Sequence, residues 1–180
     1  MTYEPSGQLT SEAADYYEKH FVPALFKERT GALLDCAKVS ARDSVLDVGC
    51  GTGVLSVVAA LRGADHVRAI DVADAAVAAT ADNARRNGIS EAVTADAAPA
   101  ESLDGTYDIV LANILAPELI ALAPHLRSLT ASDGSLVISG ILAGAHGHVL
   151  DALRPMVVER TEVLDGWAAV TLRHPAPRPT

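Results

Sequence analysis

Three glycines that could form a ligand-binding loop lie close together in the segment VLDVGCGTG, which runs from Val45 to Gly53. Glycine at this density lets the backbone turn sharply and approach a ligand closely. Gly49, Gly51 and Gly53 are spaced G-x-G-x-G. Val54 stands where a dinucleotide fingerprint needs its third glycine, and no lysine is near, as a phosphate-binding P-loop would require. The spacing therefore favours a ligand that is neither a dinucleotide nor a simple phosphate.

An acid next to this loop narrows the choice of ligand. Asp47 stands two residues before the first glycine, where its carboxylate would repel an anion and attract a cation. S-adenosylmethionine carries an ammonium group and a sulfonium, so it fits a site where a pyrophosphate does not. The alternative for the glycines is a tight strand-to-helix turn that binds nothing.

The elements that must position the loop alternate between strand and helix patterns. Apolar runs predict strands at residues 43–48, 66–72, 92–97, 107–114 and 134–141. Helical patterns lie between and after them at residues 52–63, 73–88, 116–130 and 144–155. Two last strands in residues 156–174 meet at Asp165-Gly166, which is a hairpin signal.

This alternation predicts an α/β fold, a Rossmann-like doubly wound sheet of seven strands. The sheet should be mostly parallel with an antiparallel C-terminal hairpin, and helices should cover both faces. In such sheets a ligand lies at the carboxyl ends of the strands, where the strand order reverses. The glycine loop follows the first strand, so we expect the ligand there.

The residues D-x-G-x-G-x-G resemble the first motif of the class I S-adenosylmethionine-dependent methyltransferases (EC 2.1.1). The resemblance implies S-adenosyl-L-methionine as methyl donor and S-adenosyl-L-homocysteine as product. Asp71 ends the second strand, where one carboxylate could accept hydrogen bonds from both ribose hydroxyls. Asp96 and Ala97 end the third strand and would meet the adenine. Asn113 ends the fourth strand, beside the expected place of the methyl group. An exposed strand-end acid without a ligand is the alternative for Asp71 and for Asp96.

The predicted donor-binding residues come from the ends of four strands. They are Asp47, Gly49, Cys50, Gly51, Gly53, Asp71, Val72, Asp96, Ala97, Asn113 and Ile114.

A narrower resemblance covers residues 44–173. The segments NILA at 113–116, LIALAP at 119–124 and SGIL at 139–142 look like the catalytic domain of the ribosomal protein L11 methyltransferases. Members of that family methylate amino groups of a ribosomal protein, which they hold with a separate N-terminal domain. No segment of this chain resembles that domain, and residues 16–35 look instead like the leading helices of small-molecule methyltransferases.

We therefore expect one methyltransferase domain over residues 1–180. It would comprise a helical lid at 1–40, a catalytic core at 41–174 and a flexible tail at 175–180. Three residues are catalytic candidates. Asn113 could orient the acceptor, Tyr17 could place an aromatic ring against the sulfonium, and His20 could act as general base. For the tyrosine, simple packing is the alternative.

The acceptor predicted from this lid is a small molecule, with a protein amine (lysine or N-terminal) as the alternative. A catalytically idle binding module that keeps the fold is a third reading. A net charge of -9 and the lack of a basic stripe argue against nucleic acid and anionic membrane as partners.

The location and assembly expected from the sequence are simple. No secretory signal and no apolar run of membrane-spanning length are present, so a cytoplasmic location is expected. The two cysteines give no metal or disulfide framework, and no metal is expected. The hairpin and the lid would both offer surfaces for a homodimer.

Overall fold

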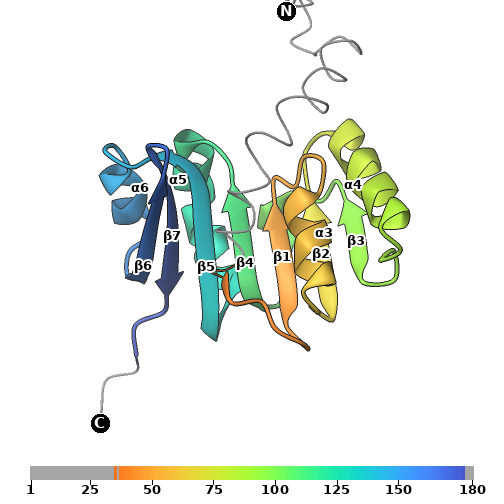
Figure 1. The fold of residues 1–180 in the computed structure, drawn as a ribbon. Coiled ribbons are helices and arrows are strands. Elements are labelled where there is room, and N and C mark those ends of the chain that lie inside the picture. The colour runs from red at the N-terminus through yellow and green to blue at the C-terminus, as the bar shows by residue number, and fades with distance from the viewer. Residues whose placement is uncertain (1–34, 36, 177–180) are drawn as a thin grey trace, which may run out of the picture.

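Seven strands form one sheet in the computed structural model, which describes residue 35 and residues 37–176 (Figure 1). The strands are β1 (Ser44–Val48), β2 (His66–Ile70), β3 (Val93–Asp96), β4 (Tyr107–Asn113), β5 (Thr130–Leu142), β6 (Val157–Leu164) and β7 (Trp167–Arg173). The helices of this part are α3 (Val54–Leu61), α4 (Asp74–Arg86), α5 (Ala116–Leu129) and α6 (Gly147–Ala152). A single 3-10 turn, Ala100–Ser102, connects β3 to β4.

The strand order is β3-β2-β1-β4-β5-β7-β6, which confirms the predicted doubly wound sheet. Strands β1 to β5 run parallel, while β7 pairs antiparallel with both β5 and β6. The hairpin turns at Asp165 and Gly166, which both have positive φ, as a two-residue turn of type I′ requires. The order reverses between β1 and β4, so the glycine loop lies at the switch point.

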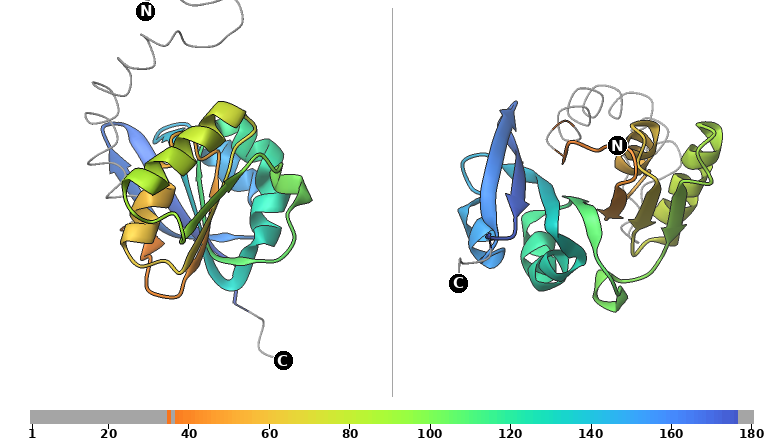
Figure 2. Two further views of the ribbon diagram at one scale, coloured as in Figure 1. Left: turned by 90° about the vertical axis from the view of Figure 1, so that its right-hand side faces the viewer. Right: turned by 90° about the horizontal axis from the view of Figure 1, so that it is seen from below.

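Helices cover both faces of the sheet, and each face has its own apolar core (Figure 2). Successive side chains of a strand point to opposite faces, so each strand contributes to both cores. On one face Leu46 and Val110 pack against α5. On the other face Val45 and Leu111 pack with α3. The strands beneath the glycine loop are therefore held from both sides.

The α5 face is only partly covered. Helix α5 packs on β4 and β5, and the two helices beside β2 and β3, α3 and α4, belong to the opposite face. The connection from β3 to β4 holds only the short turn Ala100–Ser102 in place of a longer helix. Arg68 of β2 and Thr94 of β3 consequently remain half-buried and exposed, respectively.

The fifth strand begins earlier than the sequence indicated. We predicted it from Gly134, but it starts at Thr130, whose hydroxyl donates to the Leu126 carbonyl at the end of α5. Gly134 lies inside the strand, where an added Cβ would be 2.7 Å from the Asp108 carbonyl oxygen. This crowding coincides with an irregular register between β4 and β5, so the glycine marks a bulge and not a strand start.

Most of the predicted lid, including Tyr17 and His20, lies outside the described residues, as does most of the predicted tail. Among the residues that the structure describes, no helix has the length and apolar character needed to cross a bilayer.

Candidate functional site

The glycine loop is hydrogen-bonded to the end of the neighbouring strand, β2. The amides of Gly49 and Cys50 both donate to the Ile70 carbonyl of β2, at 2.9 and 3.0 Å. Gly53 then serves as N-cap of α3, and its carbonyl accepts the Val57 amide at 2.8 Å. The loop thus bridges two adjacent parallel strands at their carboxyl ends, which is the edge predicted for the ligand.

Asp71 ties the loop to the start of α4. One oxygen of its carboxylate accepts the Gly51 amide at 3.0 Å, and the other accepts the Ala73 amide at 3.0 Å. The side chain is half-buried. A carboxylate oxygen can accept two hydrogen bonds, so each oxygen keeps capacity for one further donor. Two hydroxyls on adjacent carbons would match that capacity.

Asp47 lies beneath the loop and is 1% exposed. Its Oδ2 accepts the amide and the hydroxyl of Ser56 at 3.1 and 2.5 Å, while Oδ1 has no hydrogen-bond partner in the described residues. Burial raises the pKa of this carboxyl to about 6, against the lowering effect of the Ser56 hydrogen bonds. A buried carboxylate with one unpartnered oxygen is suited to receive a donor or cation from a ligand.

Asp47→Asn should change the pH dependence of folding. The folded carboxyl titrates near pH 6 and the unfolded one near pH 4, so the folded state binds more protons between these values. The free energy of unfolding of the native chain therefore loses roughly 2–3 kcal/mol from this group as pH rises from about 4 to about 6. Urea unfolding across this range should find that loss absent in the variant.

Asp108→Asn supplies the control of opposite sign. Hydrogen bonds from the amide and hydroxyl of Ser44 hold the pKa of Asp108 below its ordinary value. Its contribution to stability is present above the unfolded pKa and is lost as pH falls. A variant pair that changed the pH profile in the same sense would contradict the assignment of the buried carboxyl.

Helix α4 holds the loop from its other side, through residues that the sequence analysis did not single out. The Thr80 hydroxyl donates to the Cys50 sulfur at 3.3 Å and lies 3.2 Å from the Gly51 carbonyl oxygen. The Asn83 side-chain amide donates to the Thr52 carbonyl at 2.9 Å. Thr80 is fully buried. The sequence did contain a signal for these contacts, because two polar side chains three residues apart in an alanine-rich helix lie on one face of it.

Cys50 fills the small space within the loop. It is buried, and burial raises the pKa of its thiol to about 11. The thiol therefore stays protonated and poorly nucleophilic at neutral pH, as expected for a packing residue.

Asn113 and Ile114 reach the loop from the end of β4. A methyl group added at Gly49 would collide with the Ile114 side chain, so these two residues are in close contact. Asn113 is half-buried, and its side chain makes no hydrogen bond to the described residues. An added Cβ at Gly140 of β5 would lie 3.0 Å from the Asn113 Oδ1. The amide of Asn113 is thus enclosed at the strand ends but chemically available.

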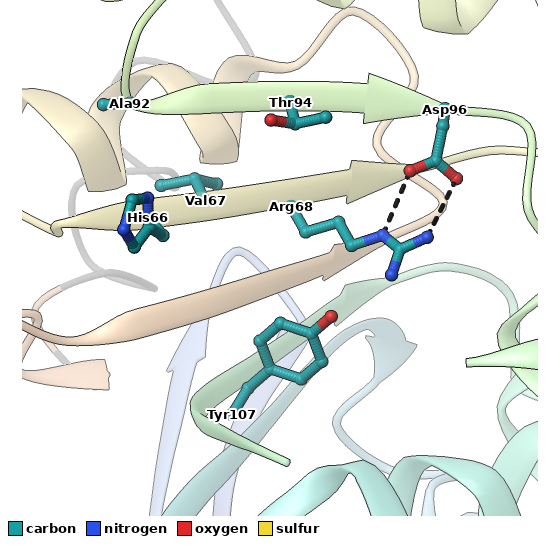
Figure 3. A pocket seen from close by; sticks show the side chains of 7 residues that line it. All are labelled: His66, Val67, Arg68, Ala92, Thr94, Asp96 and Tyr107. Atoms are coloured by element: carbon teal, nitrogen blue, oxygen red, sulfur yellow. Dashed lines mark hydrogen bonds and ion pairs between the residues drawn. The ribbon is translucent and has the colours of Figure 1, made fainter. Parts of the chain in front are cut away.

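Asp96 lies beside Asp71, since its backbone carbonyl accepts the Asp71 amide at 3.4 Å. Its carboxylate accepts the Ala98 amide at 2.9 Å and the Arg68 Nε at 3.0 Å (Figure 3). Ala97 is exposed, and Val72, directly after Asp71, is 89% exposed. The structure therefore places the predicted donor-binding residues, which lie between positions 47 and 114, along one edge of the sheet.

No group of three His, Cys, Asp or Glu side chains within residues 35 and 37–176 could hold a metal ion.

Comparison with known proteins identifies the family of this chain. The model of the ribosomal protein L11 methyltransferase family (PrmA) matches residues 32–175. The chain belongs to this family.

Individual members of the L11 methyltransferase family agree with the match. The protein of Marinobacter nauticus is 45% identical over 130 residues, 72% of this chain and 44% of that protein. The crystal structure of the ribosomal protein L11 methylase of Lactobacillus delbrueckii subsp. bulgaricus has a TM-score of 0.75 at 29% identity. It covers 81% of this chain and 76% of that chain. The same fold occurs in an RNA methyltransferase of Salinibacter ruber, with a TM-score of 0.70 at 19% identity, over 85% and 95% of the two chains.

The chain spans about half the length of the curated L11 methyltransferases that it matches. The part that the family model matches, residues 32–175, contains the whole sheet and the glycine loop. The narrower resemblance drawn from residues 44–173 is therefore confirmed at the level of the family.

Proposed function

We propose that the chain binds S-adenosylmethionine at the carboxyl edge of β1 to β4 and transfers its methyl group to an amino group of a protein. Residues 41–174 would form the catalytic core. The observation that carries the proposal is the buried Asp47 carboxylate, whose free oxygen lies under a glycine loop. Family membership and the arrangement of Asp71 and Asn113 support it.

The residues at this edge fit the donor. Asp47 offers an unpartnered anionic oxygen for a positively charged group. A Cβ at Gly51 would meet no atom within 4 Å, so the loop faces open space where a ligand could approach the backbone. Asp71 keeps acceptor capacity for the ribose hydroxyls, and the exposed Val72 offers apolar surface to the adenine.

The bound donor would supply a methyl group that is already activated on a sulfonium. The work of this chain is then alignment and exclusion of water, which can contribute on the order of 7–11 kcal/mol in favourable cases. Asp47 and Asp71 would fix the two ends of the donor. Asn113 would accept a hydrogen bond from a neutral amine and direct its lone pair toward the methyl group.

Asn113→Ala should lower turnover by about 100-fold while changing donor affinity less than about threefold. The reason is that the amide of Asn113 is proposed to orient the acceptor and contributes little to holding the donor. Single-turnover methyl transfer and calorimetric titration with S-adenosylhomocysteine measure the two quantities separately. Ser139→Ala, at the paired position of β5, is the matched control and should retain both. A variant at Asn113 that keeps normal turnover would disprove the role.

A protein acceptor is favoured over the small molecule that we predicted from residues 1–40. The curated relatives are named as methyltransferases of ribosomal protein L11. Of the predicted lid at residues 1–40, the structure describes only residue 35 and residues 37–40, so it adds nothing in favour of a small-molecule acceptor. The acceptor best supported is therefore an amine of ribosomal protein L11 or of a protein like it.

Transfer of tritium from labelled donor tests this acceptor. Purified ribosomal protein L11 and the small-molecule filtrate of a bacterial extract are offered to the chain in parallel. We expect acid-precipitable label in the protein sample alone. Label confined to the filtrate would restore the small-molecule acceptor. If neither sample gains label although S-adenosylhomocysteine binds, the chain is an idle binding module.

A further inference from the structure

The Arg68–Asp96 ion pair crosses two neighbouring strands on the partly uncovered face of the sheet. Arg68 of β2 pairs in register with Thr94, so Asp96 is the next residue of β3 on the same face. The guanidinium reaches along this diagonal, with Nε 3.0 Å from Oδ2 and a second nitrogen 3.5 Å from Oδ1. This two-pronged contact fixes the plane of the carboxylate as well as its position.

The surroundings of the pair are open on one side. A pocket of about 450 Å³ extends along this face, and Figure 3 shows Arg68 and Tyr107 pointing into it. The side chains of Arg68 and Asp96 are 36% and 33% exposed. Hydrogen bonds to Asp96 and Tyr107 hold the pKa of the guanidinium above its ordinary value, and an arginine side chain is charged in any case. A partly exposed pair of this kind contributes little to folding.

The pair also ends at the edge where the donor is proposed to bind. Asp96 adjoins Asp71 through the backbone, and the Ala98 amide donates to Oδ1 of the same carboxylate, which the second Arg68 nitrogen also contacts. Three donors from two residues therefore fix Asp96, and Oδ2, which accepts only the Arg68 Nε, keeps capacity for one further donor. A carboxylate oxygen accepts a hydrogen bond from an amino group only when it is turned toward that group, so the orientation of Asp96 decides whether it can recognise one.

We infer that Arg68 is a positioning residue that holds the Asp96 carboxylate in the orientation needed to recognise the 6-amino group of adenine. This inference rests on the proposed donor site. It assigns selectivity for the base to a side chain in the middle of β2, which would not itself touch the ligand.

The test is the preference of the full chain for S-adenosylhomocysteine over its purine analogue, which has hydrogen in place of the 6-amino group. Wild type should prefer the amino compound by roughly tenfold or more, the worth of a charged hydrogen bond. Arg68→Met should weaken binding of S-adenosylhomocysteine alone and reduce the preference to about threefold or less. Asp96→Asn should do the same, and the double variant should lose nothing further, because both residues serve one contact.

Arg173→Met is the matched control. Arg173 of β7 pairs with Glu159 of the neighbouring strand β6 at 2.6 Å, with exposures of 39% and 40%, although these strands are antiparallel and Glu159 lies at a bulge. Its removal breaks a similar ion pair at the far edge of the sheet and should leave the preference unchanged. Wild type in about 1 M NaCl supplies a second measurement without any substitution, because salt screens a partly exposed pair, and the preference should fall.

The outcomes separate this inference from the proposed function. Arg68→Met that weakens both compounds equally, or keeps the preference, overturns the role of Arg68 while the donor site stands. Failure of wild type to bind either compound overturns the donor site and this inference with it.

Discussion

Asp71→Ala should weaken binding of S-adenosylhomocysteine about 100-fold, because two charge-assisted hydrogen bonds to the ribose would be lost. The substitution also frees the amides of Gly51 and Ala73, which both bind this carboxylate at 3.0 Å. We therefore expect a smaller loss of about 1–2 kcal/mol in the free energy of unfolding. Isothermal titration calorimetry and urea unfolding measure the two effects.

Asp74→Ala is the control for this prediction. Asp74 is an exposed acid three residues further on, in the first turn of α4, and has no proposed contact with the donor. Its variant should bind within about twofold of wild type. Equal losses at both positions would mean that general negative charge, and not the specific carboxylate of Asp71, is responsible.

Gly53→Ala should mainly lower stability, whereas Gly51→Ala should mainly weaken donor binding. Both glycines have positive φ, +76° and +55°. At Gly53 a Cβ would also lie 2.6 Å from Thr80 Cγ2, so Gly53→Ala should cost about 3 kcal/mol of stability. At Gly51 the Cβ meets nothing, so Gly51→Ala should cost only about 1–2 kcal/mol.

For donor affinity, Gly51→Ala should have the larger effect. Its methyl group would occupy the open space proposed for the donor, so affinity should fall at least tenfold in a chain that still folds. Thermal unfolding and calorimetry measure both properties for each variant. Adding Thr80→Ala to Gly53→Ala removes two of the three contacting atoms and should recover part of the lost stability. A Gly53→Ala chain as stable as wild type would show that the loop does not pack against α4 as described.

The fold was largely predictable because its signals are local. Buried parallel strands read as apolar runs, and turn residues such as Asp165-Gly166 separate them. The start of β5 was missed because Gly134, a bulge inside the strand, looked like a boundary.

The site was predictable where residues follow strand ends and not where helices reach back to them. Asp47, Asp71 and Asn113 lie at the carboxyl ends of β1, β2 and β4, which are neighbours in the sheet, so topology alone brings them to one edge. Thr80 and Arg68 depend on tertiary contacts, with the loop and with Asp96 respectively. No local sequence pattern indicates which strand or loop such a side chain will contact, so these two contacts could not be predicted from the sequence.

The central position of β1 governs when the protein can fold during synthesis. Its partners are β2, which follows soon after, and β4, whose first residue is Tyr107. A nascent chain that ends before β4 leaves one edge of β1 without hydrogen bonds and Leu46 without Val110 beside it. Such an unpaired strand edge attracts other strands. Emergence of Tyr107–Asn113 from the ribosome therefore pairs the second edge of β1 and brings Asn113 to the loop, while the unpaired edge passes to β4 until β5 follows.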